Sequence, residues 1–319
     1  MKKYRTKSHR PISTEKKVPR RYSSKKNISI IWDFDGTLTP DDSTTRVVEH
    51  FQGSNQGGEF WKMIKDLRGD RPNKKLLWEH ILASDAPIWM YSLGRMATDR
   101  QIPLNEEFFR REILKHIKLY PNVINFLKSI RGFENLARFK KLNLKVHHFI
   151  VSAGLQDLIR LVFPNDVMSW TFGCRFNPVV HQSQIIENVP VFCMDESMKT
   201  RSIFEICKGT FFDPEQGVNK RVHGDDLWCP FGNMIYVGDG DTDIPALSLV
   251  RDRGGLGIAV YNSKKSKKDL NTKLRNMALD RRADLITPAN FTQKSELYQF
   301  IETRCTQVLQ RYEATVKKF

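Results

Sequence analysis

Two carboxylates lie two residues apart in the stretch IIWDFDGTL, which begins at Ile30. Asp33 and Asp35 follow an apolar run, and Gly36 comes directly after them. Two like charges at the end of a buried strand repel each other unless a cation stands nearby. Mg²⁺ prefers hard oxygen ligands and is commonly held by one or two carboxylates together with a substrate phosphate. The pair therefore predicts a metal site, although Asp beside Gly is also an ordinary turn sequence.

Two further apolar runs end in polar sequence that contains glycine. FIVSAG places Ser152 just before Gly154, and IYVGDGDTD carries Asp239 and Asp243. In an open parallel sheet, ligands bind beyond the carboxyl ends of the strands. We therefore expect these residues to meet the Asp33 region at one edge of a sheet.

Apolar periodicity divides most of the chain into strands and helices. Short apolar runs predict strands at 28–34, 145–151, 168–176, 184–194, 233–237, 256–260 and 285–288. Apolar residues spaced by three and four predict helices at 44–51, 59–67, 74–82, 86–97, 106–117, 155–163, 200–207, 244–250 and 295–312. Strands that alternate with helices predict an α/β protein with a Rossmann-like parallel sheet.

The chain between the first two polar strand ends is much longer than a simple crossover requires. Asp35 and Ser152 are 117 residues apart, and most of the intervening chain has helical spacing. We expect an inserted helical cap domain at 43–141, with the α/β core formed by 27–42 and 142–319. Tryptophans in helical patterns usually belong to a core rather than to a stacking platform, and we expect this of the three in the cap: Trp61, Trp78 and Trp89.

Most of the net charge of +16 belongs to the N-terminus. Residues 1–26 hold eleven Lys or Arg and one acid, Glu15. Such a tail buries little and is expected to be disordered. It suits attraction to nucleic acid or another polyanion, but no nucleic-acid-binding motif accompanies it, and a solvated extension is the simpler interpretation. A transit peptide is a weaker interpretation because Lys outnumbers Arg.

Composition also indicates the class of protein and its compartment. No apolar run is long enough for a membrane span, and no secretory signal pattern is present. Five scattered cysteines without a CxxC pair indicate reduced thiols. We expect a cytoplasmic protein that does not associate with a membrane; its oligomeric state is not predicted.

Four motifs in order resemble those of the haloacid dehalogenase (HAD) superfamily. DFDGTL at Asp33 resembles the first, FIVSAG the second, MKTRSI with Lys199 the third, and VGDGDTD the fourth. The likeness covers about residues 28–260 and is nearest to phosphoserine-phosphatase-like members, which carry a helical cap between the first two motifs. The first and fourth motifs are specific, whereas the second and third gain weight from their position.

The resemblance implies a Mg²⁺-dependent phosphatase that forms an aspartyl-phosphate. Asp33 would be the nucleophile, and Asp35 would protonate the leaving group and then activate water. Mg²⁺ would be held by Asp33, Asp239 and the backbone carbonyl of Asp35. Asp243 would act at the metal or orient the lysine.

The resemblance also implies a phosphate-binding set. Ser152 would donate a hydrogen bond to a phosphoryl oxygen, and Lys199 would balance its negative charge. Backbone N–H groups at Gly36 and Thr37 would cradle the phosphate.

Several of these residues have ordinary alternatives. Ser152 is also placed to cap the helix that follows it. Lys208 and Lys220 compete with Lys199 for the lysine role. Other polar residues near the motifs are given no role: Asp241 is not assigned as a ligand, and His147 and His148 are expected to be structural.

The presence of Asp35 favours a phosphate ester, because an alkoxide leaving group needs a proton. Transfer of the phosphate to another alcohol would use the same residues and stays an alternative. The cap favours a small phosphorylated metabolite, for which Arg46, Arg68 and Arg95 are candidate contacts. A nucleic-acid-associated protein, or a phosphatase of polynucleotide ends recruited by the tail, is the alternative from another class.

Overall fold

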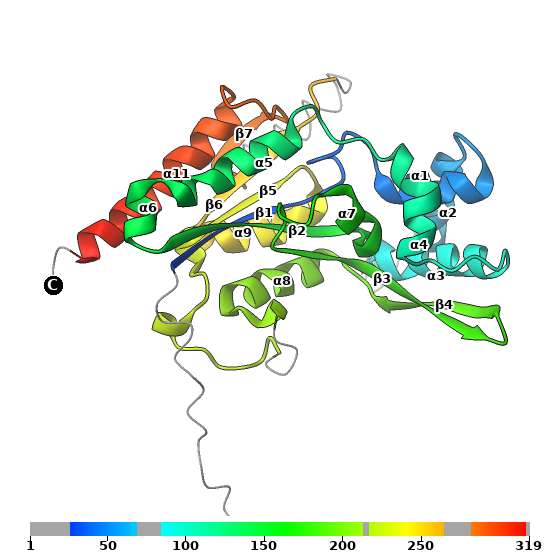
Figure 1. Cartoon of the computed structure of the whole chain (residues 1–319). Coiled ribbons are helices and arrows are strands. Elements are labelled where there is room, and N and C mark those ends of the chain that lie inside the picture. The colour runs from blue at the N-terminus through cyan, green and yellow to red at the C-terminus, as the bar shows by residue number, and fades with distance from the viewer. Residues whose placement is uncertain (1–25, 69–83, 213–216, 265–281, 317–319) are drawn as a thin grey trace, which may run out of the picture.

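The computed structural model describes residues 26–68, 84–212, 217–264 and 282–316. Seven strands form one sheet in the order β4-β3-β2-β1-β5-β6-β7 (Figure 1). Their bounds are Lys26–Trp32 (β1), Leu144–Leu155 (β2), Trp170–His181 (β3), Gln184–Phe192 (β4), Met234–Gly238 (β5), Leu256–Tyr261 (β6) and Leu285–Pro288 (β7). Every neighbouring pair is parallel except β3 and β4. The expected α/β class with a parallel core sheet is therefore confirmed.

The helices fall into two groups. Between β1 and β2 lie α1 (Ser43–Gln52), α2 (Gly57–Arg68), α3 (Asp85–Thr98), α4 (Glu106–Phe108) with the turns that continue it to His116, α5 (Val123–Arg131) and α6 (Ala137–Lys141). The later helices are α7 (Gln156–Val162), α8 (Glu196–Lys208), α9 (Ile244–Asp252) and α11 (Glu296–Val316). Several expected features lie outside the described residues: the helix at 74–82 with Trp78, the tail through residue 25, and the side chains of Arg68 and Asp241.

Helices cover both faces of the sheet. Ile30 and Trp32 of β1 belong to a buried cluster with α5 and α11, whereas Ile31 belongs to a second cluster with α8 and α9. Figure 1 shows α5, α6 and α11 on one side of the sheet and α8 and α9 on the other. Because successive side chains of a strand point to opposite faces, a strand covered on both sides carries apolar residues on both faces, as Ile30, Ile31 and Trp32 do in β1.

Strand β1 differs slightly from its expected bounds. It begins at Lys26, which pairs with Leu144, so the basic tail ends one residue earlier than expected. It ends at Trp32, and the N–H of the next residue, Asp33, donates to the carbonyl of Val237 in β5 at 2.8 Å. The first motif is thus fixed against the end of β5.

The expected cap boundary at residue 141 is corrected by the packing of α5 and α6. Phe126 and Leu127 of α5 and Phe139 of α6 are buried in the cluster that contains Trp32 and Val146 of the sheet. These two helices cover one face of the sheet, whereas α1 to α4 gather beyond the ends of the strands (Figure 1). The helical insertion that stands apart from the sheet therefore ends before Val123.

The β3–β4 hairpin extends from the sheet to the inserted helices. The amide of Asn188 is 1% exposed. Its Nδ2 donates to the carbonyl of Ile102 at 3.0 Å, and its Oδ1 accepts from the N–H of Leu104 at 2.8 Å. Asn188 N–H also donates to Oγ1 of Thr98, the last residue of α3, at 2.9 Å. The hairpin is therefore fastened to the insertion by buried hydrogen bonds.

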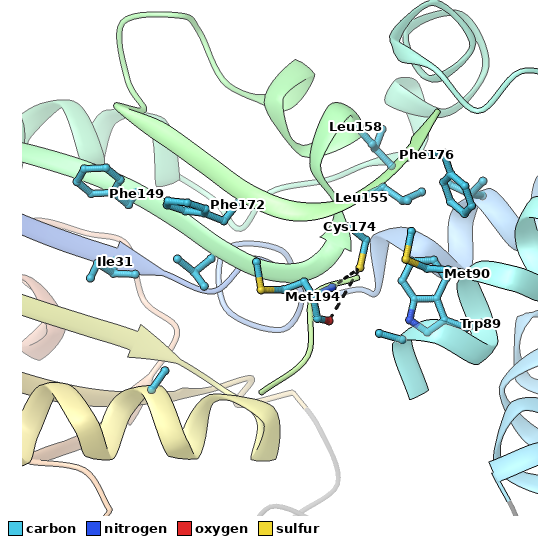
Figure 2. Close-up of a cluster of buried hydrophobic side chains, with 14 of the residues drawn as sticks. Ile31, Trp89, Met90, Phe149, Leu155, Leu158, Phe172, Cys174, Phe176 and Met194 are labelled. Carbon is cyan, nitrogen blue, oxygen red and sulfur yellow. Dashed lines mark hydrogen bonds between the residues drawn. The ribbon is translucent and has the colours of Figure 1, made fainter. Parts of the chain in front are cut away.

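A hydrophobic cluster runs without interruption from the sheet to α3. Figure 2 shows Phe149 and Phe172 of the sheet at one end of this cluster and Trp89 and Met90 of α3 at the other. Between them, Met194 N–H donates to Sγ of Cys174 at 3.1 Å. The insertion therefore packs on the core through side chains as well as through its chain connections.

All five cysteines are free thiols, and four of them are buried. Burial raises the pKa of Cys174 to about 12. Within the described ranges, no helix has the length and apolar character that a membrane crossing requires.

Candidate active site

Three carboxylates meet beyond the carboxyl ends of β1 and β5. One oxygen from each of Asp33, Asp239 and Asp243 lies within 4.8 Å of the others. Asp33 follows β1, and Asp239 and Asp243 follow β5, so the parallel pairing of these two strands brings the first and fourth motifs together. A cavity of about 500 Å³ opens over this cluster between the sheet and α1–α3.

Lys199 lies at the floor of this cavity and is 1% exposed. Its Nζ donates to Oδ1 of Asp33 at 2.9 Å, to Oδ1 of Asp243 at 2.6 Å and to Oγ1 of Thr242 at 3.3 Å. Helix α8 positions it, beginning at an Asp195 cap that accepts from the N–H of Met198. The ammonium group therefore bridges the first and fourth motifs.

The two competing lysines lie elsewhere. Lys208 donates from Nζ to the backbone carbonyls of Val218 and Lys220. The side chain of Lys220 is exposed and does not line the cavity. Among the three candidates, the structure brings only Lys199 to the carboxylates.

Asp243 accepts three hydrogen bonds from groups around it. Its Oδ1 accepts from Lys199 and from the hydroxyl of Tyr236 at 2.7 Å, and its Oδ2 accepts from the N–H of Gly240 at 3.0 Å. Of the two expected roles for Asp243, this arrangement favours orientation of the lysine. Sequence reasoning missed Tyr236, whose polar hydroxyl in an otherwise aliphatic strand was the available signal.

Burial and like charge act on Asp33. Its removal from water, followed by the charge of Asp243, raises the pKa of Asp33 to about 7, against the opposing effect of Lys199. Burial also opposes the charge on Lys199, but Asp243 and Asp33 outweigh it and raise the pKa of Lys199 above its ordinary value. The lysine therefore stays charged and holds positive charge against the candidate nucleophile.

Asp35 has a separate environment at the start of α1. Its Oδ1 accepts from the N–H of Ser43 at 2.8 Å, and its Oδ2 accepts from the Ser43 hydroxyl at 3.0 Å. Burial, then the charges of Asp42 and Asp33, raises the pKa of Asp35 well above its ordinary value. A carboxyl group that keeps its proton in this way suits a general acid.

Two glycines allow the motifs to approach closely. Gly36 has φ +80°, and a Cβ there would lie 2.4 Å from an oxygen of Asp239. A Cβ at Gly154 would lie 2.9 Å from Oδ2 of Asp35. Side chains at these positions would push the first motif away from the fourth and the second.

The structure does not bring the backbone N–H groups of Gly36 and Thr37 to the cavity, where they were expected to cradle the phosphate. The N–H of Thr37 donates to the carbonyl of Phe34 at 3.2 Å. Neither Gly36 nor Thr37 lines the cavity. Gly36 instead serves the turn and the close approach to Asp239.

Ser152 lines the cavity and is buried. Its Oγ accepts from the N–H of Gly154 at 3.1 Å, which leaves the hydroxyl proton for another acceptor. The alternative that Ser152 caps the next helix fails, because α7 begins at Gln156 without a side-chain cap.

The chemistry of the donor set fits a divalent cation. Three carboxylates offer hard oxygen atoms within one small volume, and Mg²⁺ takes such ligands. Lys199 supplies only one positive charge against the three. A cation beside Asp33 and Asp239 would therefore complete the charge of the cluster.

The two described tryptophans of the insertion were expected to belong to the core, and the structure places them both at the core and at the cavity wall. Trp89 is 4% exposed and belongs to the core cluster, as expected, and Trp61 packs against that cluster. Both also line the cavity. Their ring centroids are 6.4 Å apart, with the planes at 69°.

No family model matches this chain. An uncharacterized protein of Borreliella burgdorferi is 26% identical in an alignment 202 residues long, which covers 58% of this chain and 66% of that protein, slightly under two thirds.

Solved structures with a similar course of the chain have low sequence identity. A phospho-aspartyl intermediate analogue of phosphoserine phosphatase has a TM-score of 0.49 and 15% identity, over 88% of this chain and 99% of that one. A probable phosphoserine phosphatase from Vibrio cholerae has a TM-score of 0.46 and 12% identity, over 91% and 69%. Cytosolic 5′-nucleotidase IIIB bound to cytidine has a TM-score of 0.47 and 14% identity, over 92% and 87%. The function proposed below rests on side-chain geometry rather than on these likenesses.

Proposed function

We propose that this chain is a Mg²⁺-dependent HAD-type phosphatase that hydrolyses small phosphate monoesters through an aspartyl-phosphate on Asp33. One observation carries this proposal: the buried ammonium of Lys199 bridges Asp33 and Asp243 at the floor of a cavity that also contains Asp239. A purely structural ion pair would not need a third carboxylate or a cavity above it. Perturbed pKa values in a cavity of this kind are typical of catalytic groups.

The first half of the reaction transfers the phosphoryl group to the protein. A carboxylate oxygen of Asp33 attacks phosphorus, and the bond from phosphorus to the ester oxygen breaks. Asp35 gives its proton to the departing oxygen, so that the product leaves as an alcohol. Lys199 balances the negative charge of the nucleophile and of the transferring group, and the hydroxyl of Ser152 donates to a phosphoryl oxygen, while negative charge shifts toward the leaving group.

The second half releases phosphate. Asp35, now a carboxylate, takes a proton from water as the water oxygen attacks phosphorus. The bond between phosphorus and Asp33 breaks, which restores the Asp33 carboxylate and releases inorganic phosphate. Asp35 ends the cycle protonated, as its raised pKa favours.

We assign Mg²⁺ to Asp33, Asp239 and the backbone carbonyl of Asp35. When bound there, the ion would supply positive charge that offsets the nucleophile and the phosphoryl oxygens. Asp243 supports the lysine. The alternatives of transfer to a second alcohol, and of a polynucleotide substrate recruited by the tail of residues 1–26, stay predictions, as does a cytoplasmic location.

Phosphate release from a panel of small phosphate esters, in Mg²⁺ or in EDTA, tests this function. We expect turnover in Mg²⁺ only, and a loss of about a thousandfold or more in kcat for Asp33→Asn. Asp166→Asn, at an exposed acid outside the cavity, is the matched control and should match the wild type. Turnover that survives in Asp33→Asn would overturn the assignment of the nucleophile.

A further inference from the structure

We propose that two copies of this chain associate through the outer face of the β3–β4 hairpin, with Arg175 of each copy against Glu187 of the other. We call this surface the hairpin face, and its side chains are Arg175, Val179, Ile186, Glu187, Val189 and Val191. None of these residues lines the cavity over Asp33, so the inference goes beyond the proposed function and does not depend on it.

Register and burial separate the two faces of the hairpin. Val179 lies opposite Glu187 in the antiparallel pairing, and directly opposite residues point to the same face. Asn177 and Val189, two residues along, form the next pair on that face. Asn188 points to the other face, where its amide is buried against the chain that follows α3. The hairpin face is therefore the side turned away from the insertion, and Figure 1 shows the hairpin projecting beyond the sheet with α3 along one side.

The hairpin face exposes a contiguous group of apolar side chains. Val179 is 44% exposed, Val191 49% and Ile186 52%. Ile186 and Val191 are the residues of β4 that the two irregularities in the register leave without a partner on β3. Single exposed apolar residues are ordinary, but a group of them on one face indicates a surface that binds another protein.

The edge of β4 is closed to the addition of another strand. The side chain of Gln101 accepts at Oε1 from the N–H of Ile185 at 2.8 Å and donates from Nε2 to the carbonyl of Ile185 at 3.0 Å. The N–H of Asn188 donates to Oγ1 of Thr98 at 2.9 Å. These side chains occupy backbone groups that a further strand would need. A partner is therefore expected to pack on the hairpin face rather than to extend the sheet.

The charges of the hairpin face suit a second copy of the same chain. Arg175 and Glu187 are both exposed, and neither forms an ion pair with a described residue. Glu187 lies opposite Val179, which is four residues, or about 13 Å, along β3 from Arg175. A twofold axis that crosses the strands at Asn177 reverses their direction, so Arg175 of each copy comes beside Glu187 of the other. This charge complementarity favours a second copy over an unrelated protein.

The size of the hairpin face predicts a weak dimer. Six side chains from each copy bury on the order of 1,000 Å² in total, which is at the lower end for specific interfaces. Ion pairs at the rim of an interface contribute orientation more than affinity. We therefore expect a Kd of about 10 µM, so that the dimer forms only in concentrated solution.

Sedimentation velocity of the full chain, from about 1 to 200 µM, tests this inference. We expect Glu187→Arg to raise the Kd of the dimer about tenfold or more, because it places two arginines against each other in both contacts. The double variant Arg175→Glu, Glu187→Arg restores the pairing with its charges exchanged and should return the Kd to within about threefold of the wild type. Glu107→Arg makes the same change of charge at an exposed acid of α4 and should leave the Kd unchanged.

The outcomes that overturn the inference are distinct from misfolding. The substituted side chains are exposed, so the urea midpoint of each variant should match that of the wild type. If the wild type is a monomer at every concentration, another segment of the chain or a different protein covers the face, and the inference is wrong. A dimer whose Kd does not respond to Glu187→Arg, or a loss that the double variant does not restore, also overturns it.

Discussion

Two buried polar networks on neighbouring strands differ in charge: one contains charged side chains, and the other is neutral. Beyond β1 and β5, the charged Lys199 lies between the carboxylates of Asp33 and Asp243. Between β2 and α5, His148 accepts at Nδ1 from Nε1 of Trp32 at 3.1 Å and donates from Nε2 to the carbonyl of Leu127 at 2.9 Å. Because indole only donates and a carbonyl only accepts, these partners fix the neutral imidazole with hydrogen on Nε2.

The difference separates a structural network from a functional one. Burial lowers the pKa of His148 to about 3, so the histidine stays uncharged and both of its nitrogen atoms are satisfied. At the other network, burial favours neutral carboxyl groups, yet Lys199 and Asp243 are held as a charged pair. Buried charges of this kind contribute little net stability, which is consistent with their retention for chemistry.

Lys199→Met should produce the largest change, because it leaves Asp33 and Asp243 buried without their cation. We expect the free energy of unfolding in EDTA at pH 8 to fall by about 3 to 5 kcal/mol, measured by urea denaturation. Lys208→Met, which removes contacts to backbone carbonyls only, is the control and should cost about 1 kcal/mol. Equal losses in the two variants would contradict the claim that Asp33 and Asp243 depend on the buried cation of Lys199.

The pH dependence should sharpen the comparison, since His148 is destabilised by acid. A histidine with a folded pKa near 3 contributes stability that is fully present above its unfolded pKa of about 6.5 and is lost as pH falls toward 3. We expect about 2 kcal/mol of the acid loss between pH 7.5 and 5 to come from this residue. His148→Gln should lack that part of the loss, and His147→Gln, beside it on β2, should keep it. An identical pH profile in the two variants would contradict the neutral network.

Tyr236→Phe should have the smallest effect, because Asp243 keeps two other donors. Loss of this hydrogen bond should lower the free energy of unfolding by about 1 to 2 kcal/mol. Tyr298→Phe, which loses a half-buried contact to Ser129, is the comparison and should cost less. Thermal denaturation of the three proteins measures the difference, and a larger loss in Tyr298→Phe would argue against a role for Tyr236 in holding Asp243.

The sequence pattern correctly predicted which residues meet because they follow neighbouring parallel strands. Parallel strands carry whatever follows them to one edge, so Asp33 and Asp239 were predicted to meet from the apolar runs before them. The position of a residue at a strand end does not reveal a role that depends on the packing of other elements. Tyr236 acts through a residue seven positions on, and Asn188 acts through an insertion about ninety residues earlier.

The C-terminal boundary of the insertion also depends on packing that the sequence pattern does not reveal. Helix α5 has an apolar face like that of α1, and periodicity does not say what that face packs against. Only the structure shows that Phe126 meets Trp32 of the sheet, at 6.1 Å between ring centroids.

The buried amide of Asn188 determines which part of the chain could be exchanged as a unit with another protein. If α1–α4 were exchanged for the corresponding region of another protein while the hairpin was kept, Asn188 would lose Thr98, Ile102 and Leu104 together. A buried amide without partners costs about 1 to 3 kcal/mol for each unsatisfied group. The transferable unit for grafting a new specificity onto this sheet is therefore discontinuous: the insertion must travel with strand β4.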